Sequence, residues 1–122
     1  MSLEECVNKA REDISEQGMC YLAFDVVGSS NMDNGFFHKT ILSLRDDLNK
    51  KFMKYFVGDI YKKKCAGVRG CFETYRADSA GTYISSPNAV KEIIEYTKEN
   101  YSDFPLRWAV AKDPRDKEIR SL

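Results

Sequence analysis

The chain has 122 residues, 43% of them hydrophobic and 31% charged, and its 19 basic and 19 acidic side chains give a formal net charge of zero. This length supports one compact core and excludes two full domains. The neutral balance excludes a broad nucleic-acid or anionic-membrane surface, which would carry a basic excess.

Cysteine content and hydropathy favour a cytoplasmic domain with reduced thiols. The four cysteines form no C-x-x-C pair and there is one histidine, so a closed zinc site is not expected. The longest apolar run, Met19 to Phe24, is far shorter than the roughly 20 residues of a bilayer span. The charged residues 1–18 lack the apolar segment of a secretory signal.

The first segment predicts an amphipathic helix over residues 2–17. Ser2 followed by Glu5 is a capping-box pattern, and Gly18 is a typical stop. One apolar stripe runs through Leu3, Val7, Ala10 and Ile14.

A strand is predicted from Cys20 to Val27, because the segment is short, apolar and rich in aromatic and β-branched residues. Alternation gives it two faces. The bulky face holds Cys20, Leu22, Phe24 and Val26, and the other holds Tyr21, Ala23, Asp25 and Val27. Asp25 therefore stands near the end of a strand that is otherwise built to be buried.

Turn-rich residues 28–31 and 33–35 follow, and a long helix is predicted over residues 36–56. Its apolar stripe is Phe37, Ile41, Leu44, Leu48, Phe52 and Tyr55. Residues 58–64, which end in a run of three lysines, fit either a further helical turn or irregular structure.

The second half predicts a hairpin, a helix and a last strand. The hairpin strands are residues 70–75 and 82–85, with the turn at 78–81. The helix covers residues 88–100 after Pro87, with Ser85 or Ser86 as its cap. Its buried side is Val90, Ile93, Ile94, Thr97 and Tyr101. The last strand covers residues 106–111, with Leu106, Trp108 and Val110 facing away from Arg107, Ala109 and Ala111.

The order of elements predicts one α+β domain with a ferredoxin-like βαββαβ antiparallel sheet. It consists of an N-terminal helix at 1–18, the sheet and its helices at 19–111, and a loose charged tail at 112–122. We expect both long helices on one face of the sheet, and the first strand beside the first strand of the hairpin. The other face is left open unless the N-terminal helix or a partner covers it.

Two aspartates are the candidates for chemistry. Asp25 ends the first strand and Asp78 lies at the hairpin turn, so the two carboxylates are expected at one edge of the sheet. Mg²⁺ prefers oxygen ligands and usually takes one or two carboxylates plus substrate phosphates. Small residues such as Gly28 to Ser30 suit a triphosphate. The structural alternatives are that Asp25 caps the following loop and that Asp78 only shapes a turn.

Two segments resemble a known family. Residues 24–30, FDVVGSS, look like the strand-one motif of class III nucleotidyl cyclases. Residues 76–83, RADSAGTY, resemble the hairpin where cyclases carry Gly-Asp and diguanylate cyclases carry Gly-Gly-Asp-Glu-Phe. The resemblance covers residues 19–111 and implies a palm domain of the cyclase and GGDEF-like superfamily.

This resemblance implies a reaction in which a ribose 3′-hydroxyl attacks an α-phosphorus of a nucleoside triphosphate and pyrophosphate leaves, with Mg²⁺ or Mn²⁺ as cofactor. Asp25 and Asp78 are the implied catalytic metal ligands, with Val26 as a carbonyl ligand. The turn of Gly28, Ser29 and Ser30 is the implied site of the phosphates. Cyclases of this class usually act as dimers, so a homodimer is implied as well.

Two arginines and several departures from the family keep alternatives open. Arg76, beside Asp78, is a salt-bridge partner or a phosphate contact of the nucleotide, and Arg107 is a similar case. Ala77 stands where the family usually has Gly, and no Glu follows Asp78. The chain also ends soon after the last strand, so we expect a minimal or degenerate member. The alternative is a non-catalytic ferredoxin-like module that binds a nucleotide or a protein partner.

Overall fold

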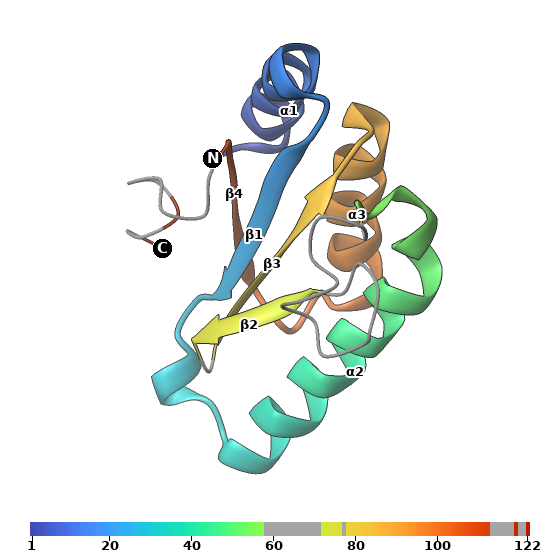
Figure 1. Ribbon diagram of the computed structural model, residues 1–122. Helices are drawn as coiled ribbons and strands as arrows, with labels where there is room; N and C mark the ends of the chain where they lie inside the picture. The colour runs from blue at the N-terminus through green and yellow to red at the C-terminus, as the bar shows by residue number, and fades with distance from the viewer. Residues whose placement is uncertain (58–71, 77, 113–118, 120–121) are drawn as a thin grey trace.

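A computed structural model describes residues 1–57, 72–76, 78–112, 119 and 122, with the backbone alone described at 73–76. The helices and strands are α1 (Leu3–Gln17), β1 (Cys20–Val26), α2 (Asn34–Phe52), β2 (Glu73–Arg76), β3 (Ser79–Ile84), α3 (Pro87–Asn100) and β4 (Leu106–Ala111) (Figure 1). Short 3₁₀ turns lie at Ser29–Asn31 and Met53–Tyr55. The predicted α+β class is confirmed.

The four strands form an antiparallel sheet in the order β2-β3-β1-β4. The prediction that β1 lies beside the first strand of the hairpin is wrong, because its neighbour is the second strand, β3. The physical reason is length and burial: β3 is buried along its whole length and pairs with β1 from Cys20–Ile84 to Asp25–Ser79. β2 is only 4 residues long and its register shifts, which suits an edge strand.

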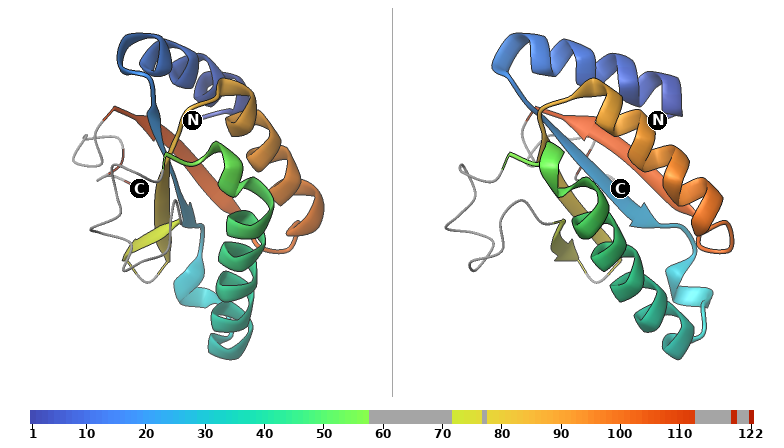
Figure 2. Two further views of the ribbon diagram at one scale, coloured as in Figure 1. Left: turned by 45° about the vertical axis from the view of Figure 1, so that its right-hand side comes forward. Right: turned by 90° about the vertical axis from the view of Figure 1, so that its right-hand side faces the viewer.

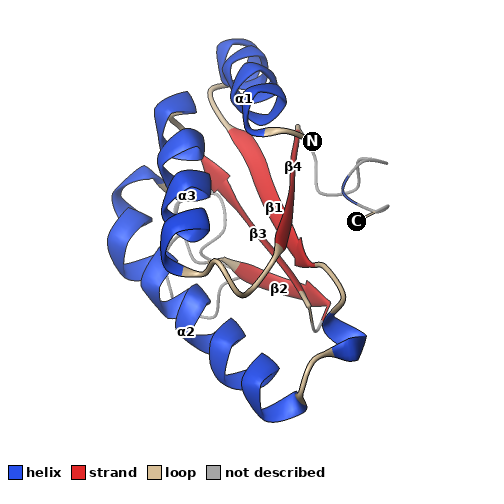
Figure 3. Cartoon of the chain, turned by 180° about the vertical axis from the view of Figure 1, so that it is seen from behind, coloured by secondary structure: helices blue, strands red, loops and turns tan. Residues whose placement is uncertain are grey.

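All three helices lie on the same side of the sheet (Figures 2 and 3). They cover the face of β1 that carries Leu22 and Phe24, where the Phe24 ring lies 5.2 Å from Trp108 and 5.6 Å from Phe72 between centroids. α1 contributes Cys6 and Ala10 to this same core. The N-terminal helix therefore joins the helix layer and does not cover the other face.

Local signals place the helix ends close to their predicted positions. Ser2 and Glu5 form both bonds of the capping box, and Gly18 ends α1 in the left-handed conformation, with φ 82°. Asp33 caps α2 by accepting from the Phe36 backbone N–H. α2 ends at Phe52, earlier than predicted, because a 3₁₀ turn follows and Phe56 then pairs with Ile84 at the end of β3.

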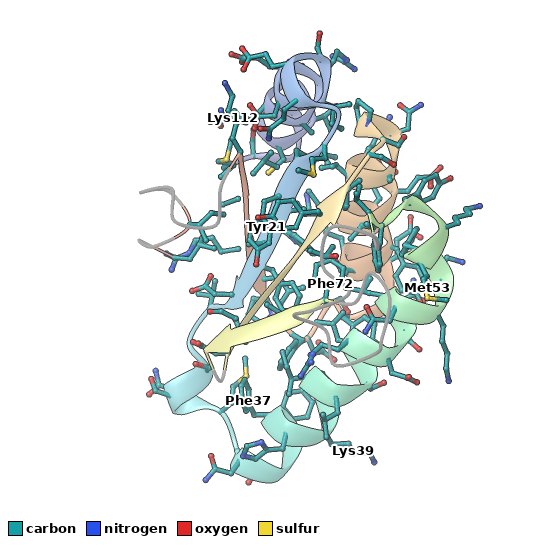
Figure 4. All side chains as sticks on the ribbon, viewed as in Figure 1. Tyr21, Phe37, Lys39, Met53, Phe72 and Lys112 are labelled. Carbon is teal, nitrogen blue, oxygen red and sulfur yellow. The ribbon has the colours of Figure 1, made fainter. Side chains whose placement is uncertain are left out.

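The opposite face of the sheet, here called the open face, carries small residues and tyrosines. Its buried cluster is Tyr21, Ala23, Tyr83, Ala109, Ala111 and Ile119. Figure 4 labels Tyr21 on β1. Its ring lies so close to Gly81 of β3 that a Cβ added at Gly81 would clash with the ring and the hydroxyl. Ile119 is 1% exposed, so the prediction of a loose tail is wrong at this residue, which packs on apolar side chains of the sheet.

The hairpin turn also differs from its predicted position. We expected the turn at residues 78–81, but β3 begins at Ser79, so Gly81 lies inside the strand. The pairing of Ser79 with Asp25 and of Gly81 with Ala23 extends β3 to this point. Residues 58–71, Ala77 and most of the tail, on which further predictions fall, lie outside the described residues. Within the described residues, no helix combines the length and apolar character needed to cross a membrane.

Candidate functional site

Asp25 lies on the open face near the end of β1 and is only 6% exposed. The antiparallel register places Arg107 of β4 directly opposite it. Arg107 donates from Nε to Oδ1 at 3.1 Å and from Nη2 to Oδ2 at 2.8 Å. Both carboxylate oxygens therefore accept from one guanidinium in a bidentate, charge-assisted pair, the strong form of this contact.

Asp78 is half-buried in the turn between β2 and β3. Its Oδ2 accepts from the Ser29 hydroxyl at 3.1 Å and its Oδ1 from the Ser79 hydroxyl at 3.3 Å. Its backbone carbonyl accepts from the Val26 N–H at 2.9 Å. These contacts hold the hairpin turn against the end of β1, so Val26, the candidate carbonyl ligand, lies directly beside Asp78.

The charges of both aspartates act on the pKa of Arg107. The hydrogen bonds and charge of Asp25, with a smaller contribution from the charge of Asp78, raise the pKa of Arg107 although desolvation opposes this. A charge acts on another in this way only over short distances, because solvent screens longer ones. Asp25 pairs with Ser79, the residue after Asp78, and the Val26 N–H donates to the Asp78 carbonyl. Asp25 and Asp78, which come from opposite halves of the chain, therefore lie at the same end of the sheet.

The turn after β1 completes this end of the sheet. Gly28 is left-handed, with φ 71° and ψ 24°, and a Cβ there would meet nothing within 4 Å. Glycine is therefore favoured at this position by backbone conformation and not by lack of space. Ser29 is half-buried against Asp78, whereas Gly28 and Ser30 are exposed. The Val27 N–H donates to the Pro105 carbonyl at 3.0 Å, which ties this turn to the start of β4.

The donor set fits only one kind of metal site. Among the described residues, no group of three or more His, Cys, Asp or Glu side chains could hold a metal ion, so a closed protein cage is not built there. Two carboxylates at one sheet end match a hard cation such as Mg²⁺, which keeps water ligands and shares its remaining positions with phosphates. Asp25 and Asp78 supply the type of oxygen ligand that such a site needs, and the Arg107 guanidinium already pairs with both oxygens of Asp25.

Two arginines, Arg76 and Arg107, are the remaining candidates from the sequence. The backbone of Arg76 pairs with Ser79, and its side chain lies outside the described part of the structure. The sequence left two roles possible for Arg107, a salt bridge and a phosphate contact, and the structure shows the salt bridge with Asp25. The signal that could have found it is alternation, because Arg107 shares the face of Ala109 and Ala111, the face on which Asp25 lies.

Comparisons of the chain with protein-family models, curated proteins and solved structures found no match. The functional argument therefore depends on the residues and their geometry.

Proposed function

We propose that the chain is a nucleotide-binding, divalent-metal-dependent domain, similar to the palm of nucleotidyl cyclases and polymerases, that acts on a nucleoside triphosphate. The observation that carries the proposal is the contact between the end of β1 and the hairpin turn. There, Val26 and Ser29 both donate to Asp78, and Asp25 stands one residue before Val26. Two carboxylates and a glycine turn meet at one end of the sheet.

The arrangement of the strands supports the ferredoxin-like assignment that belongs to this proposal. Each half of the chain from β1 onward is strand–helix–strand, and the sheet order is β2-β3-β1-β4 with all neighbours antiparallel. A βαββαβ chain with its helices on one side has this arrangement. It places the end of β1 beside the hairpin turn, where the Val26 N–H donates to the Asp78 carbonyl.

The proposed chemistry assigns a role to each part of the site. When bound, Mg²⁺ or Mn²⁺ would neutralise the phosphates and favour attack of a ribose 3′-hydroxyl on the α-phosphorus, with pyrophosphate leaving. Asp25, Asp78 and the Val26 carbonyl would hold the cation. The exposed backbone at Gly28 and Ser30 would face the phosphates, and Ser29 would keep the turn against Asp78. Arg76 remains a candidate phosphate contact.

A homodimer and a cytoplasmic location belong to the same proposal. Cyclases of this class usually act as dimers, and a cytoplasmic domain meets nucleoside triphosphates together with Mg²⁺. The second candidate is a non-catalytic module that binds a nucleotide or a protein partner. The Asp25–Arg107 pair is the observation that favours it, because an ion pair that already satisfies both oxygens of Asp25 serves a purely structural role equally well.

The test is a thermal-shift titration with Mg²⁺ or Mn²⁺ and ATP or GTP, followed by a pyrophosphate-release assay. We expect a rise in melting temperature that requires both cation and nucleotide, since a ligand that binds only the folded state stabilises it. The rise and any pyrophosphate release should disappear in Asp25→Asn and Asp78→Asn. Asp46→Asn is the matched control, because Asp46 is an exposed α2 carboxylate paired with Lys50.

The outcomes separate the candidates. Stabilisation with pyrophosphate release identifies an enzyme, and stabilisation without release identifies a nucleotide-binding module. No stabilisation of the wild type with either cation and either nucleotide would contradict the proposal and leave the protein-partner module. Equal loss in Asp46→Asn and Asp25→Asn would show that the response comes from general surface charge.

A further inference from the structure

We propose that Arg107 is a positioning residue that occupies the Asp25 carboxylate in the ligand-free protein and transfers to the phosphates when a metal–triphosphate complex binds. Cation and triphosphate would then bind cooperatively, with Arg107 as the coupling group. This inference rests on the proposed function and extends it to the order in which the site fills.

The first step of the argument is competition for Asp25. Both oxygens of this carboxylate accept from Arg107, at 3.1 and 2.8 Å. A divalent cation must approach a carboxylate oxygen to within about 2.0–2.6 Å. The guanidinium and the cation carry charges of the same sign, and two such groups on one buried carboxylate repel each other strongly. The cation therefore binds well only after the guanidinium has moved.

The second step is that Arg107 can move without opening the core. Its side chain is 50% exposed, whereas that of Asp25 is 8% exposed. The guanidinium thus lies at the solvent side of the pair, on a long flexible stem, and the carboxylate is the fixed partner. Because the buried aromatic core lies on the opposite face of the sheet, rotation of Arg107 leaves it intact.

The third step is that the alternative position for the guanidinium lies nearby. Arg107 follows Pro105 by two residues, and the Pro105 carbonyl accepts from Val27 at the start of the glycine turn. The turn in which we place the phosphates is therefore joined to the segment that carries Arg107. A guanidinium pairs with phosphate oxygens in the same bidentate geometry as with a carboxylate. Phosphates at the turn would attract the Arg107 guanidinium away from Asp25, and the Asp25 carboxylate would then be free to bind the cation.

The size of the coupling depends on the fraction of time that Arg107 spends away from Asp25. If the ion pair is closed for about 90% of the time, the apparent affinity for the cation is about 10-fold weaker than that of the open site. Coupling between two ligands is reciprocal, so the cation strengthens triphosphate binding by the same factor.

The experiment compares wild type, Arg107→Gln and Arg11→Gln in two binding titrations. Arg11 is an exposed arginine of α1 and undergoes the same change of charge, which makes Arg11→Gln the matched control. The first titration measures Mn²⁺ alone by electron paramagnetic resonance. The second measures a non-hydrolysable, fluorescent triphosphate analogue at saturating Mn²⁺. Glutamine is chosen because it removes the positive charge and keeps an uncharged hydrogen-bond donor in the side chain.

We expect opposite shifts in the two titrations. Arg107→Gln should bind Mn²⁺ about 10-fold more tightly than wild type, and at saturating Mn²⁺ it should bind the triphosphate more weakly. Arg11→Gln should match wild type in both. A purely structural role for Arg107 would weaken both affinities or change neither, and either result overturns the inference. If neither wild type nor Arg107→Gln binds Mn²⁺, with or without triphosphate, the proposed function itself fails.

A measurement on the unaltered chain covers the case in which Arg107→Gln does not fold. The ¹⁵Nε–H resonance of Arg107 reports its hydrogen-bond partner in wild-type protein. We expect it to shift when Mg²⁺ and the triphosphate analogue are added together. A resonance that keeps its ligand-free position at saturation would show that Arg107 stays on Asp25 and would overturn the inference.

Discussion

The two faces of the sheet are built from the same strands and differ in almost every other respect. The helix-covered face carries large apolar side chains, among them Phe24, Trp108 and Leu22, packed into one core with all three helices. The open face carries alanines, two tyrosines and a glycine under the Tyr21 ring at one end, and the pair of Asp25 and Arg107 at the other.

This difference separates the face that holds most of the buried apolar side chains from the end of the sheet that carries the candidate site. The covered face buries aromatic rings that each bring a large apolar area out of water. The open face has a smaller buried cluster, which includes Ile119, Tyr21 and Tyr83, and it carries the charged pair of Asp25 and Arg107 at the candidate site. The candidate site thus lies on the face opposite the main apolar core, with Asp25 itself buried there.

The largest loss of stability is expected from a substitution in the core on the helix-covered face. Phe24→Ala should lower the free energy of unfolding by about 3–5 kcal/mol, because the ring is fully buried against Trp108 and Phe72 and leaves a cavity. Urea denaturation measures the change. Leu42→Ala on α2 is the control, since Leu42 is 62% exposed and should change stability by less than about 0.5 kcal/mol. Similar losses in the two variants would contradict this assignment of the core.

An intermediate effect is expected at the close contact on the open face. Gly81→Ala should cost about 1–3 kcal/mol, because the new Cβ would meet the Tyr21 ring and displace it. In a double-mutant cycle with Tyr21→Ala, the cost of Gly81→Ala should largely disappear, since the ring is no longer there. Equal costs in the presence and absence of the ring would show that the loss arises from the strand backbone instead.

The smallest effect is a pH dependence that arises on the covered side. Burial, with a further contribution from the charge of Asp13, raises the pKa of the Cys20 thiol from 9.0 to about 12. Between these values the unfolded chain has lost a proton that the folded chain keeps, so stability should fall as pH rises. For one group the slope is at most about 1.4 kcal/mol per pH unit.

Urea denaturation at pH 7, 9 and 10 tests this, with Cys20→Ala as the comparison. The decline between pH 9 and 10 should be shallower in Cys20→Ala than in wild type. Burial and a hydrogen bond to Asp47 also raise the pKa of Tyr101, to about 12. Tyr101 therefore leaves a residual decline of stability with rising pH in both proteins. Parallel curves for the two proteins would show that the Cys20 thiol is open to solvent.

Much of the local structure could be predicted from the sequence. Capping at Ser2, the stop at Gly18 and the periodic stripes of α2 and α3 act within one or two turns of chain, so their effects are written in neighbouring residues. Alternation in β1 and β4 likewise separated the bulky face from the face of Asp25. For the site, the strand and turn patterns, together with the resemblance to nucleotidyl cyclases, were enough to choose both aspartates and the glycine turn.

Only the tertiary structure decided which strands are neighbours and what Asp25 contacts. The position of β3 beside β1, the register that sets Arg107 against Asp25, and the burial of Ile119 all join residues that are far apart in the chain. Such contacts depend on how whole faces pack and pair, and no short window of sequence contains them. The sequence by itself determined the order of the helices and strands, the faces of β1 and β4 and the candidate carboxylates, but not the bounds of the hairpin. Pairing across the sheet decided that Arg107 lies opposite Asp25 and binds both of its oxygens.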